Sequence, residues 1–120
     1  MAFDNQTVIK IFRTLDMKKA KDIVVMDVSE LTTMADYFVI ATGGSDRQVK
    51  ALCDHVEEEM AKEGKFPVNK EGYRNGDWVL LGYDEAIVHI FQSETRDFYD
   101  LERIWKDAGY VDMSAEKTED

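Results

Sequence analysis

The chain is poor in the residues that build covalent and metal sites. Its 120 residues include one cysteine, Cys53, and only two histidines and one proline. A single cysteine excludes an internal disulfide and any zinc site made of several thiolates, and it fits a reducing compartment. Cys53 lies on the apolar stripe of an expected helix, so we interpret it as a buried structural thiol.

Long apolar runs are also missing. No segment approaches the length needed to span a bilayer, and the N-terminal residues show neither a secretory signal nor an Arg-rich transit peptide. A mature form whose presequence had been removed would look the same. We predict a soluble, cytoplasmic protein with no membrane partner.

Basic residues are scarce relative to acidic ones. Lys and Arg number 15, Asp and Glu number 25, and the formal net charge is −10. This balance argues against direct nucleic-acid binding as the main mode, because such binding draws on clustered Lys and Arg. It favours a basic protein as partner, although solubility alone explains the acidity of many proteins.

The length and a hydrophobic content of 44% suit one domain with a real core. We predict this domain over residues 1–110 and a flexible acidic tail over residues 111–120, where the sequence turns polar.

Hydrophobic periodicity predicts the order helix, two strands, helix, three strands, helix. The elements are a helix capped by Asn5 and ending near Lys18 and Lys19, strands over 23–26 and 37–41, a helix from Ser45 or Asp46 to near Gly64, strands over 66–74, 77–83 and 85–91, and a helix over 96–105. The short link 29–36 favours antiparallel pairing of the first two strands, and Asn75-Gly76 predicts a hairpin. The fold class is α+β, a single mixed β-sheet of about five strands with helices packed on it.

The strand over 77–83 is apolar on both faces. One face carries Trp78, Leu80 and Gly82, and the other carries Val79, Leu81 and Tyr83. Three helices need not cover both faces of a sheet. Either both faces of this strand are core, or one of them is a docking surface.

A Gly-Gly-Ser turn is the one feature that suggests catalysis. Gly43, Gly44, Ser45 and Asp46 lie between a strand and a helix, where backbone N–H groups bind phosphate in some enzymes. Nucleotidyltransferases use a similar turn together with paired metal-binding carboxylates, and no Asp-x-Asp pair occurs here. A tight turn with a capping serine is the simpler interpretation.

Other enzyme signatures are missing too. His89 lies in an apolar strand and is interpreted as hydrogen-bonded and structural, while His55 lies off the apolar stripe of its helix, without zinc spacing. We predict no enzyme activity, no catalytic or metal-binding residues and no cofactor. The charged positions of the last helix are expected to form, for the most part, a solvated face: Arg96, Asp97, Asp100, Glu102, Arg103, Lys106 and Asp107.

Three blocks resemble one known family. They cover residues 36–43, 45–51 and 78–105, the last containing Val88-His89-Ile90-Phe91 and Arg96-Asp97-Phe98-Tyr99. The sequence of these blocks resembles that of the ribosomal silencing factor family, also called RsfS or Iojap, and the resemblance extends over about residues 7–108. Two departures, Gly44 and the turn 82–85, leave loop details open.

The resemblance implies a translational repressor that binds the large ribosomal subunit through ribosomal protein L fourteen, blocks joining of the small subunit, and silences translation under nutrient limitation. It also implies a nucleotidyltransferase-like core without catalytic carboxylates, and a homodimer when free. The partner-binding residues that it suggests are Trp78 as anchor, then Asp77, Val79 and Leu80, with Tyr73 and Tyr83 flanking. Trp105 is expected to pack in the core. Alternatives are residual nucleotide binding at residues 43–46 and a generic homodimeric adaptor.

Overall fold

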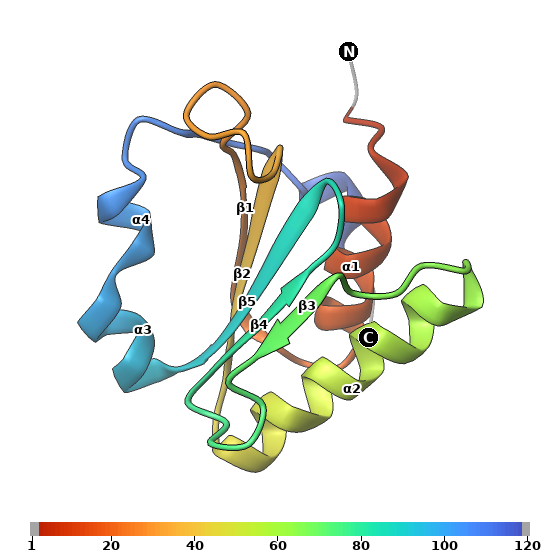
Figure 1. Cartoon of the computed structure of the whole chain (residues 1–120), viewed down its shortest axis with the longest axis vertical. Coiled ribbons are helices and arrows are strands. Elements are labelled where there is room, and N and C mark those ends of the chain that lie inside the picture. The colour runs from red at the N-terminus through yellow and green to blue at the C-terminus, as the bar shows by residue number, and fades with distance from the viewer. Residues whose placement is uncertain (1–2, 119–120) are drawn as a thin grey trace.

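One mixed β-sheet separates two helical layers of unequal size (Figure 1). The computed structural model describes residues 3–118, and within them the sheet has six strands in the order β3-β4-β5-β2-β1-β6. The elements are α1 (Gln6–Met17), β1 (Lys21–Asp27), β2 (Tyr37–Gly43), α2 (Asp46–Lys62), β3 (Asn69–Glu71), β4 (Trp78–Gly82), β5 (Ala86–Gln92), α3 (Ser93–Tyr99), α4 (Leu101–Ile104), β6 (Gly109–Tyr110) and the short 3-10 helix η1 (Ser114–Glu116). Strands β2 and β5 pair in parallel, and the other neighbours pair antiparallel.

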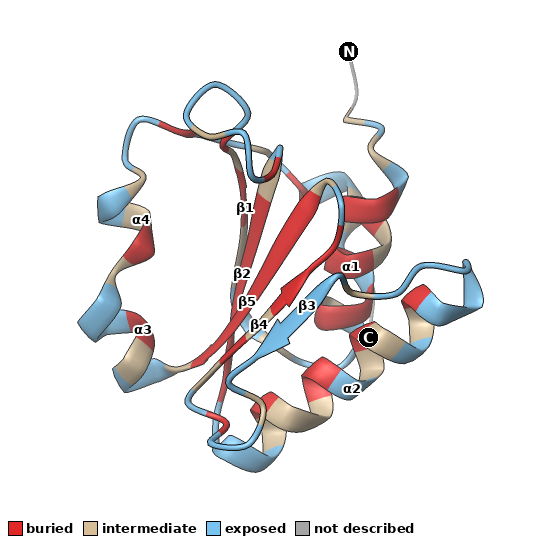
Figure 2. Ribbon diagram, viewed as in Figure 1, coloured by how far each residue is buried: buried red, intermediate tan, exposed pale blue. Residues whose placement is uncertain are grey.

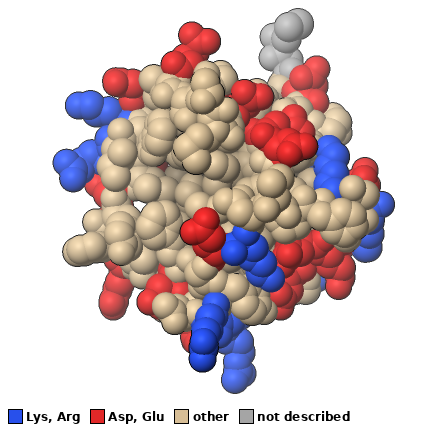
Figure 3. Space-filling model, in the orientation of Figure 1, with Lys and Arg blue, Asp and Glu red and all other residues tan. Residues whose placement is uncertain are grey.

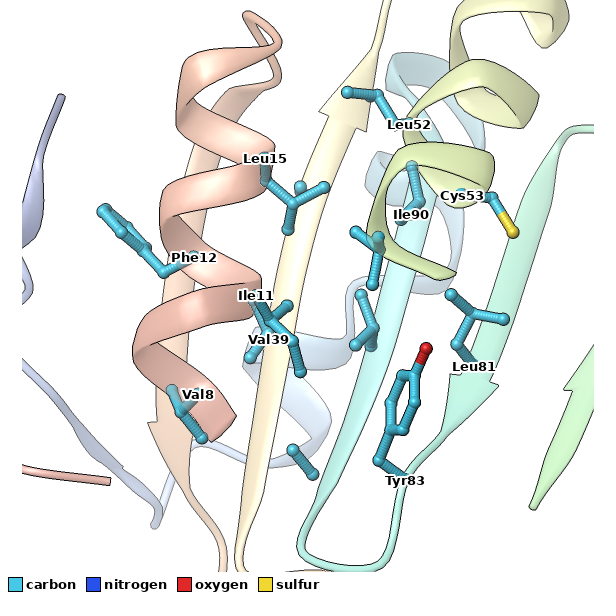
Figure 4. Close-up of a cluster of buried hydrophobic side chains, with 14 of the residues drawn as sticks. Val8, Ile11, Phe12, Leu15, Val39, Leu52, Cys53, Leu81, Tyr83 and Ile90 are labelled. Carbon is cyan, nitrogen blue, oxygen red and sulfur yellow. The ribbon is translucent and has the colours of Figure 1, made fainter. Parts of the chain in front are cut away.

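The two long helices begin at the residues predicted to cap them. The Asn5 side chain accepts a hydrogen bond from the backbone N–H of Val8, and the Ser45 hydroxyl accepts one from that of Gln48. Such caps satisfy backbone donors that have no partner within the helix. Both helices pack on one face of the sheet and form the larger core with it (Figure 4). That core includes Val8, Ile11, Leu15, Val39, Leu52, Leu81 and Ile90.

A smaller cluster lies on the opposite face of the sheet, under α3 and α4. Its buried members are Met26, Val28, Ala35, Phe38, Ile40, Ile87, Phe91, Leu101 and Ala108. These two helices are short, and Figure 2 shows that much of their surface is exposed, as is strand β3. The second layer therefore covers its face of the sheet incompletely.

The α+β class, the single mixed sheet, the antiparallel first pair and the hairpin are confirmed. The sheet has six strands where about five were predicted, because residues 109–110 add a two-residue strand beside β1. The strand predicted over 66–74 is limited to Asn69–Glu71, since Gly72 has a φ of +79° and turns the chain out of the strand.

The predicted helix over 96–105 is wrong as one continuous element. Asp100 adopts a left-handed conformation, φ 50° and ψ 58°, and separates α3 from α4. The helical stripe is thereby interrupted: Leu101 is buried, whereas Phe98 is 81% exposed. Trp105 is half-buried and packs edge-on against Phe38 at a ring-centroid distance of 5.0 Å, as expected for a core contact.

The segment predicted to be a flexible tail makes contacts with the domain up to Thr118. The Val111 N–H donates to the Val25 carbonyl over 2.8 Å, and Met113 is buried in the larger core. Thr118 donates through N–H and hydroxyl to the Asp16 carboxylate, over 2.6 and 2.9 Å. Residues 119–120 lie outside the described part of the chain. The mobility of this segment in solution stays a prediction.

Candidate functional site

Trp78 opens β4 and lies among aromatic side chains from three elements. Its ring stacks on Phe91 of β5 with centroids 4.8 Å apart, and Tyr99 of α3 contacts it at 4.8 Å. The indole N–H donates to Nδ1 of His89 over 3.0 Å. Trp78 is only half-buried, because α3 covers it from one side. This combination holds a large aromatic side chain in place at the edge of the molecule.

A groove of about 470 Å³ runs beside Trp78, between the β3–β4 loop and α3. It is lined by Gly72, Asn75, Asp77, Trp78, Glu94, Thr95, Phe98 and Tyr99. Three of these residues are aromatic, two are acidic and none is basic. Figure 3 shows mostly uncharged side chains over the part of this surface where α3 lies, whereas acidic and basic side chains gather near α4. The groove therefore combines apolar contact area with a negative rim.

The predicted site residues fall on two sides of the sheet. Asp77, Trp78 and Leu80 lie together on the side of α3 and α4, with Asp77 exposed and the other two half-buried. Val79 and Tyr83 are buried in the core beneath α1 and α2. Their side chains therefore support the strand from inside rather than reach the surface.

Tyr73 belongs to a network on the α2 side of the hairpin. Its hydroxyl donates to the Asp54 carboxylate over 3.0 Å, and Lys70 lies 4.2 Å from its ring centroid. Lys70 also pairs with Glu57 of α2 over 2.7 Å. This network fixes the β3–β4 hairpin to α2, which indirectly positions the start of β4.

Sequence reasoning missed Glu94, Phe98 and Tyr99 as lining residues. The predicted continuous helix over 96–105 placed Phe98 on the apolar stripe that faces the core. Phe98 was therefore expected to be buried. The adjacent pair Phe98-Tyr99 already indicated that one aromatic ring is exposed. Neighbouring residues of a helix point about 100° apart, so one apolar stripe does not bury both rings. The left-handed Asp100 then leaves Phe98 outside.

Arg96 is the buried exception on the charged face that was predicted to be mostly solvated, so for this residue the prediction is wrong. The residue is 9% exposed, and its guanidinium donates to the Asp22 carbonyl, the Thr42 hydroxyl and the Glu102 carboxylate over 2.7, 2.8 and 2.9 Å. Arginine has five donors in a planar fork, which lets one side chain tie three segments together. Arg96 thus anchors α3 to β1, β2 and α4.

His89 is the buried polar centre beneath the groove. It is 5% exposed, and its Nδ1 accepts from Trp78, which confirms the expected hydrogen-bonded histidine. Its Nε2 has no partner among the described residues. Burial lowers the pKa of His89 to about 4, because the charged imidazolium would lose its hydration. The ring is therefore neutral at physiological pH.

The Gly43–Ser45 turn is confirmed as a structural cap. Ser45 caps α2, and the Gly44 N–H donates to the Gln48 side chain. Gly76 lies against this helix end, where an added Cβ would come within 2.9 Å of the Asp46 Cβ. The start of α2 is therefore occupied by the protein's own groups.

Among residues 3–118, one group of three ligand-type side chains has its atoms within 4.8 Å: Cys53, Asp54 and Glu57. The carboxylates already bind Tyr73 and Lys70. Burial, and secondarily the negative charge of Glu57, raises the pKa of Cys53 to about 12. The thiol therefore stays protonated at neutral pH and is a poor metal ligand and nucleophile. In the same range of residues, no helix has the length and apolar character to cross a membrane.

Comparisons with known proteins agree on one family. The profile described as "Ribosomal silencing factor during starvation" matches residues 3–120. The ribosomal silencing factor RsfS of Bacillus subtilis is 35% identical over 82% of this chain and 83% of its own. The mouse "Mitochondrial assembly of ribosomal large subunit protein 1" is 30% identical over 95% of this chain and 50% of its own. A crystal structure from Chromobacterium violaceum is 36% identical, covers 84% of both chains and superposes with a TM-score of 0.82.

Proposed function

The chain belongs to the ribosomal silencing factor family, and from that membership we propose that it binds the large ribosomal subunit through ribosomal protein L fourteen. Bound there, it sterically blocks joining of the small subunit and represses translation under nutrient limitation. The aromatic, acid-rimmed groove beside Trp78 is the observation that carries this proposal, because it is the surface that best fits a basic protein.

Physical complementarity supports the groove as the interface. Ribosomal proteins are commonly basic because they contact RNA, whereas this chain has a formal net charge of −10. Opposite charges steer two proteins together, and half-buried aromatic side chains supply most of the affinity at an interface. Trp78 is the proposed anchor, with Leu80 beside it and Asp77 on the rim. Val79, Tyr83 and Tyr73 contribute by positioning the strand and hairpin.

The proposed mechanism is steric and needs no catalysis. The core is proposed to be nucleotidyltransferase-like in arrangement, with the Gly43–Ser45 turn retained only as a helix cap. The occupied start of α2 and the buried, high-pKa thiol of Cys53 favour binding over chemistry. We place the action in the cytoplasm, and we propose that the free protein is a homodimer.

A sucrose-gradient experiment tests the proposal directly. Wild type and Trp78→Ala are mixed with purified ribosomal subunits, and comigration and subunit joining are scored. We expect wild type to comigrate with the large subunit alone and to block joining. Truncating a true aromatic hot spot costs about 2 kcal/mol or more, roughly a thirtyfold loss of affinity.

Phe66→Ala is the matched control, because Phe66 is 68% exposed and does not line the groove. It should silence like wild type. Circular dichroism must show that Trp78→Ala is folded. Wild type remaining at the top of the gradient would overturn the proposed function, and a folded Trp78→Ala that binds normally would overturn the interface.

A further inference from the structure

The groove beside Trp78 has the composition of a receptor for a cation. Resting on the proposed function, we propose that it is a subsite for one arginine side chain of the partner, held between aromatic rings and the carboxylates of Asp77 and Glu94. The volume of about 470 Å³ lies in the range of pockets that enclose small groups.

The two carboxylates have no ion-pair partner among the described residues. The Asp77 carboxylate accepts one hydrogen bond, from the Gln92 side-chain amide over 3.1 Å, and the residue is exposed. Glu94 makes no ion pair within residues 3–118. Two unpaired acids in one groove raise the local negative potential, and a single cation between them would relieve their repulsion.

The aromatic walls favour the same ligand. Phe98 and Tyr99 are 81% and 45% exposed and meet edge to face with centroids 5.1 Å apart. Exposed rings of this size cost hydration free energy unless a partner covers them. A guanidinium stacks on ring faces and donates to carboxylates from the same plane, which an ammonium group does less well. Arginine is therefore preferred over lysine.

In a second large groove of the protein, acidic side chains are neutralised by basic side chains of the same chain. It lies between α1 and α2, where Lys10 reaches Glu63 and Glu59 over 3.2 and 3.8 Å. Arg13 and Lys18 line it as well. The carboxylates of this groove already form ion pairs within the protein, so they attract a cation of the partner only weakly. The contrast assigns cation binding to the Trp78 groove.

Isosteric variants separate this subsite from the general interface. Asp77→Asn combined with Glu94→Gln removes two charges and keeps the shape of the groove. The control pair Glu30→Gln and Glu58→Gln changes the net charge equally at exposed positions outside it. We expect the groove pair to weaken large-subunit binding at least tenfold and to flatten its salt dependence, with the control pair close to wild type.

A small-molecule titration tests the ligand chemistry without ribosomes. N-acetyl-arginine amide is added to labelled protein and followed by NMR, with the citrulline analogue as its uncharged counterpart. The arginine probe should shift the Trp78 indole and the Phe98 and Glu94 amides at millimolar concentration, and the citrulline probe and the groove pair should show no such shifts. Equal shifts with both probes, or unchanged large-subunit affinity in the groove pair, would overturn the subsite. Failure of wild type to bind the large subunit overturns the proposed function instead.

Discussion

The indole N–H of Trp78 donates to Nδ1 of His89 across the β4–β5 pair, with 3.0 Å between the nitrogens. The bond is diagonal, because Trp78 stands opposite Phe91 and His89 stands opposite Leu80. A nitrogen that accepts a hydrogen bond carries no proton, so His89 must be neutral with its proton on Nε2. Phe38 and Phe91 contact the ring and keep water from it. The orientation of the proposed anchor therefore depends on the protonation state of a buried histidine.

Folding stability should fall as pH drops below about 6.5. Burial lowers the pKa of His89 to about 4 in the folded protein, against 6.5 for the free side chain. Between these values the unfolded chain binds the extra proton, so acid favours unfolding. The loss should reach about 2 kcal/mol by pH 5 and about 3 kcal/mol near pH 4. Urea unfolding at pH 7 and pH 5 measures it.

His89→Leu removes the titrating group and keeps an apolar filling. This variant should lose much less stability than wild type between pH 7 and pH 5, even if it is weaker at both. His55→Ala removes the other histidine, at a half-buried position, and serves as the control substitution. A wild-type profile that is flat down to pH 5 would show that His89 titrates normally.

Gly72 is required where the hairpin approaches β4. Its φ is +79°, and a Cβ there would lie 1.9 Å from the Trp78 carbonyl oxygen. The nearest atoms all belong to the backbone of Trp78 and Val79 and leave little room for adjustment, so Gly72→Ala should cost more than about 2 kcal/mol of stability. Gly64→Ala is the matched control: its φ is +74° and nothing lies within 4 Å, so only the left-handed strain of about 1 kcal/mol applies. Thermal unfolding compares the two, and equal losses would refute the steric argument.

Replacing Arg96 should detach α3 from the sheet. Arg96→Met keeps most of the apolar stem but leaves the Asp22 carbonyl, Thr42 hydroxyl and Glu102 carboxylate without their donor. Loss of three hydrogen bonds from a charged donor, one of them to buried Thr42, makes a cost of about 3 kcal/mol the expected result. Arg103→Met should be nearly neutral, because its pair with Asp100 is exposed. Tyr99 amide hydrogen exchange should also accelerate in the Arg96 variant, and unchanged exchange would argue against the anchoring role.

Local patterns were sufficient for most of the fold. The caps at Asn5 and Ser45 and the antiparallel first pair follow from neighbours in sequence, and the structure confirms each. The break at Asp100 was not predictable in the same way, because an aspartate that is exposed in a helix looks no different from one in a left-handed turn. Arg96 was missed for a related reason: its partners Asp22 and Thr42 are more than 50 residues away in sequence.

In the candidate site, too, local sequence patterns predicted some features, whereas others depended on long-range packing. Alternation along β4 correctly placed Trp78 and Leu80 on one face and Val79, Leu81 and Tyr83 on the other. Which face is open depends on where α3 and α4 pack, and that is a long-range property. The sequence therefore identified Trp78, the proposed anchor, whereas the other aromatic walls of the groove, Phe98 and Tyr99, required the structure.

The C-terminal segment supplies the last prediction. Removal of residues 111–120 should destabilise the domain by about 3 kcal/mol, because it exposes the site of Met113 and removes the hydrogen bonds from Val111 to β1 and from Thr118 to Asp16. Met113→Ala alone should account for about 2 kcal/mol of this loss. Urea unfolding of both variants measures the difference.

Truncation after Thr118 is the control, since it keeps every one of these contacts. It should be closer in stability to the full chain than the truncation after Tyr110 is, and amide exchange at Val111 should be slow in the full chain, because that N–H is bonded to the Val25 carbonyl. If truncation after Tyr110 instead leaves stability unchanged and Val111 exchanges as fast as an unfolded peptide, the segment is a flexible acidic tail in solution from residue 111 onward, and the domain is complete at residue 110.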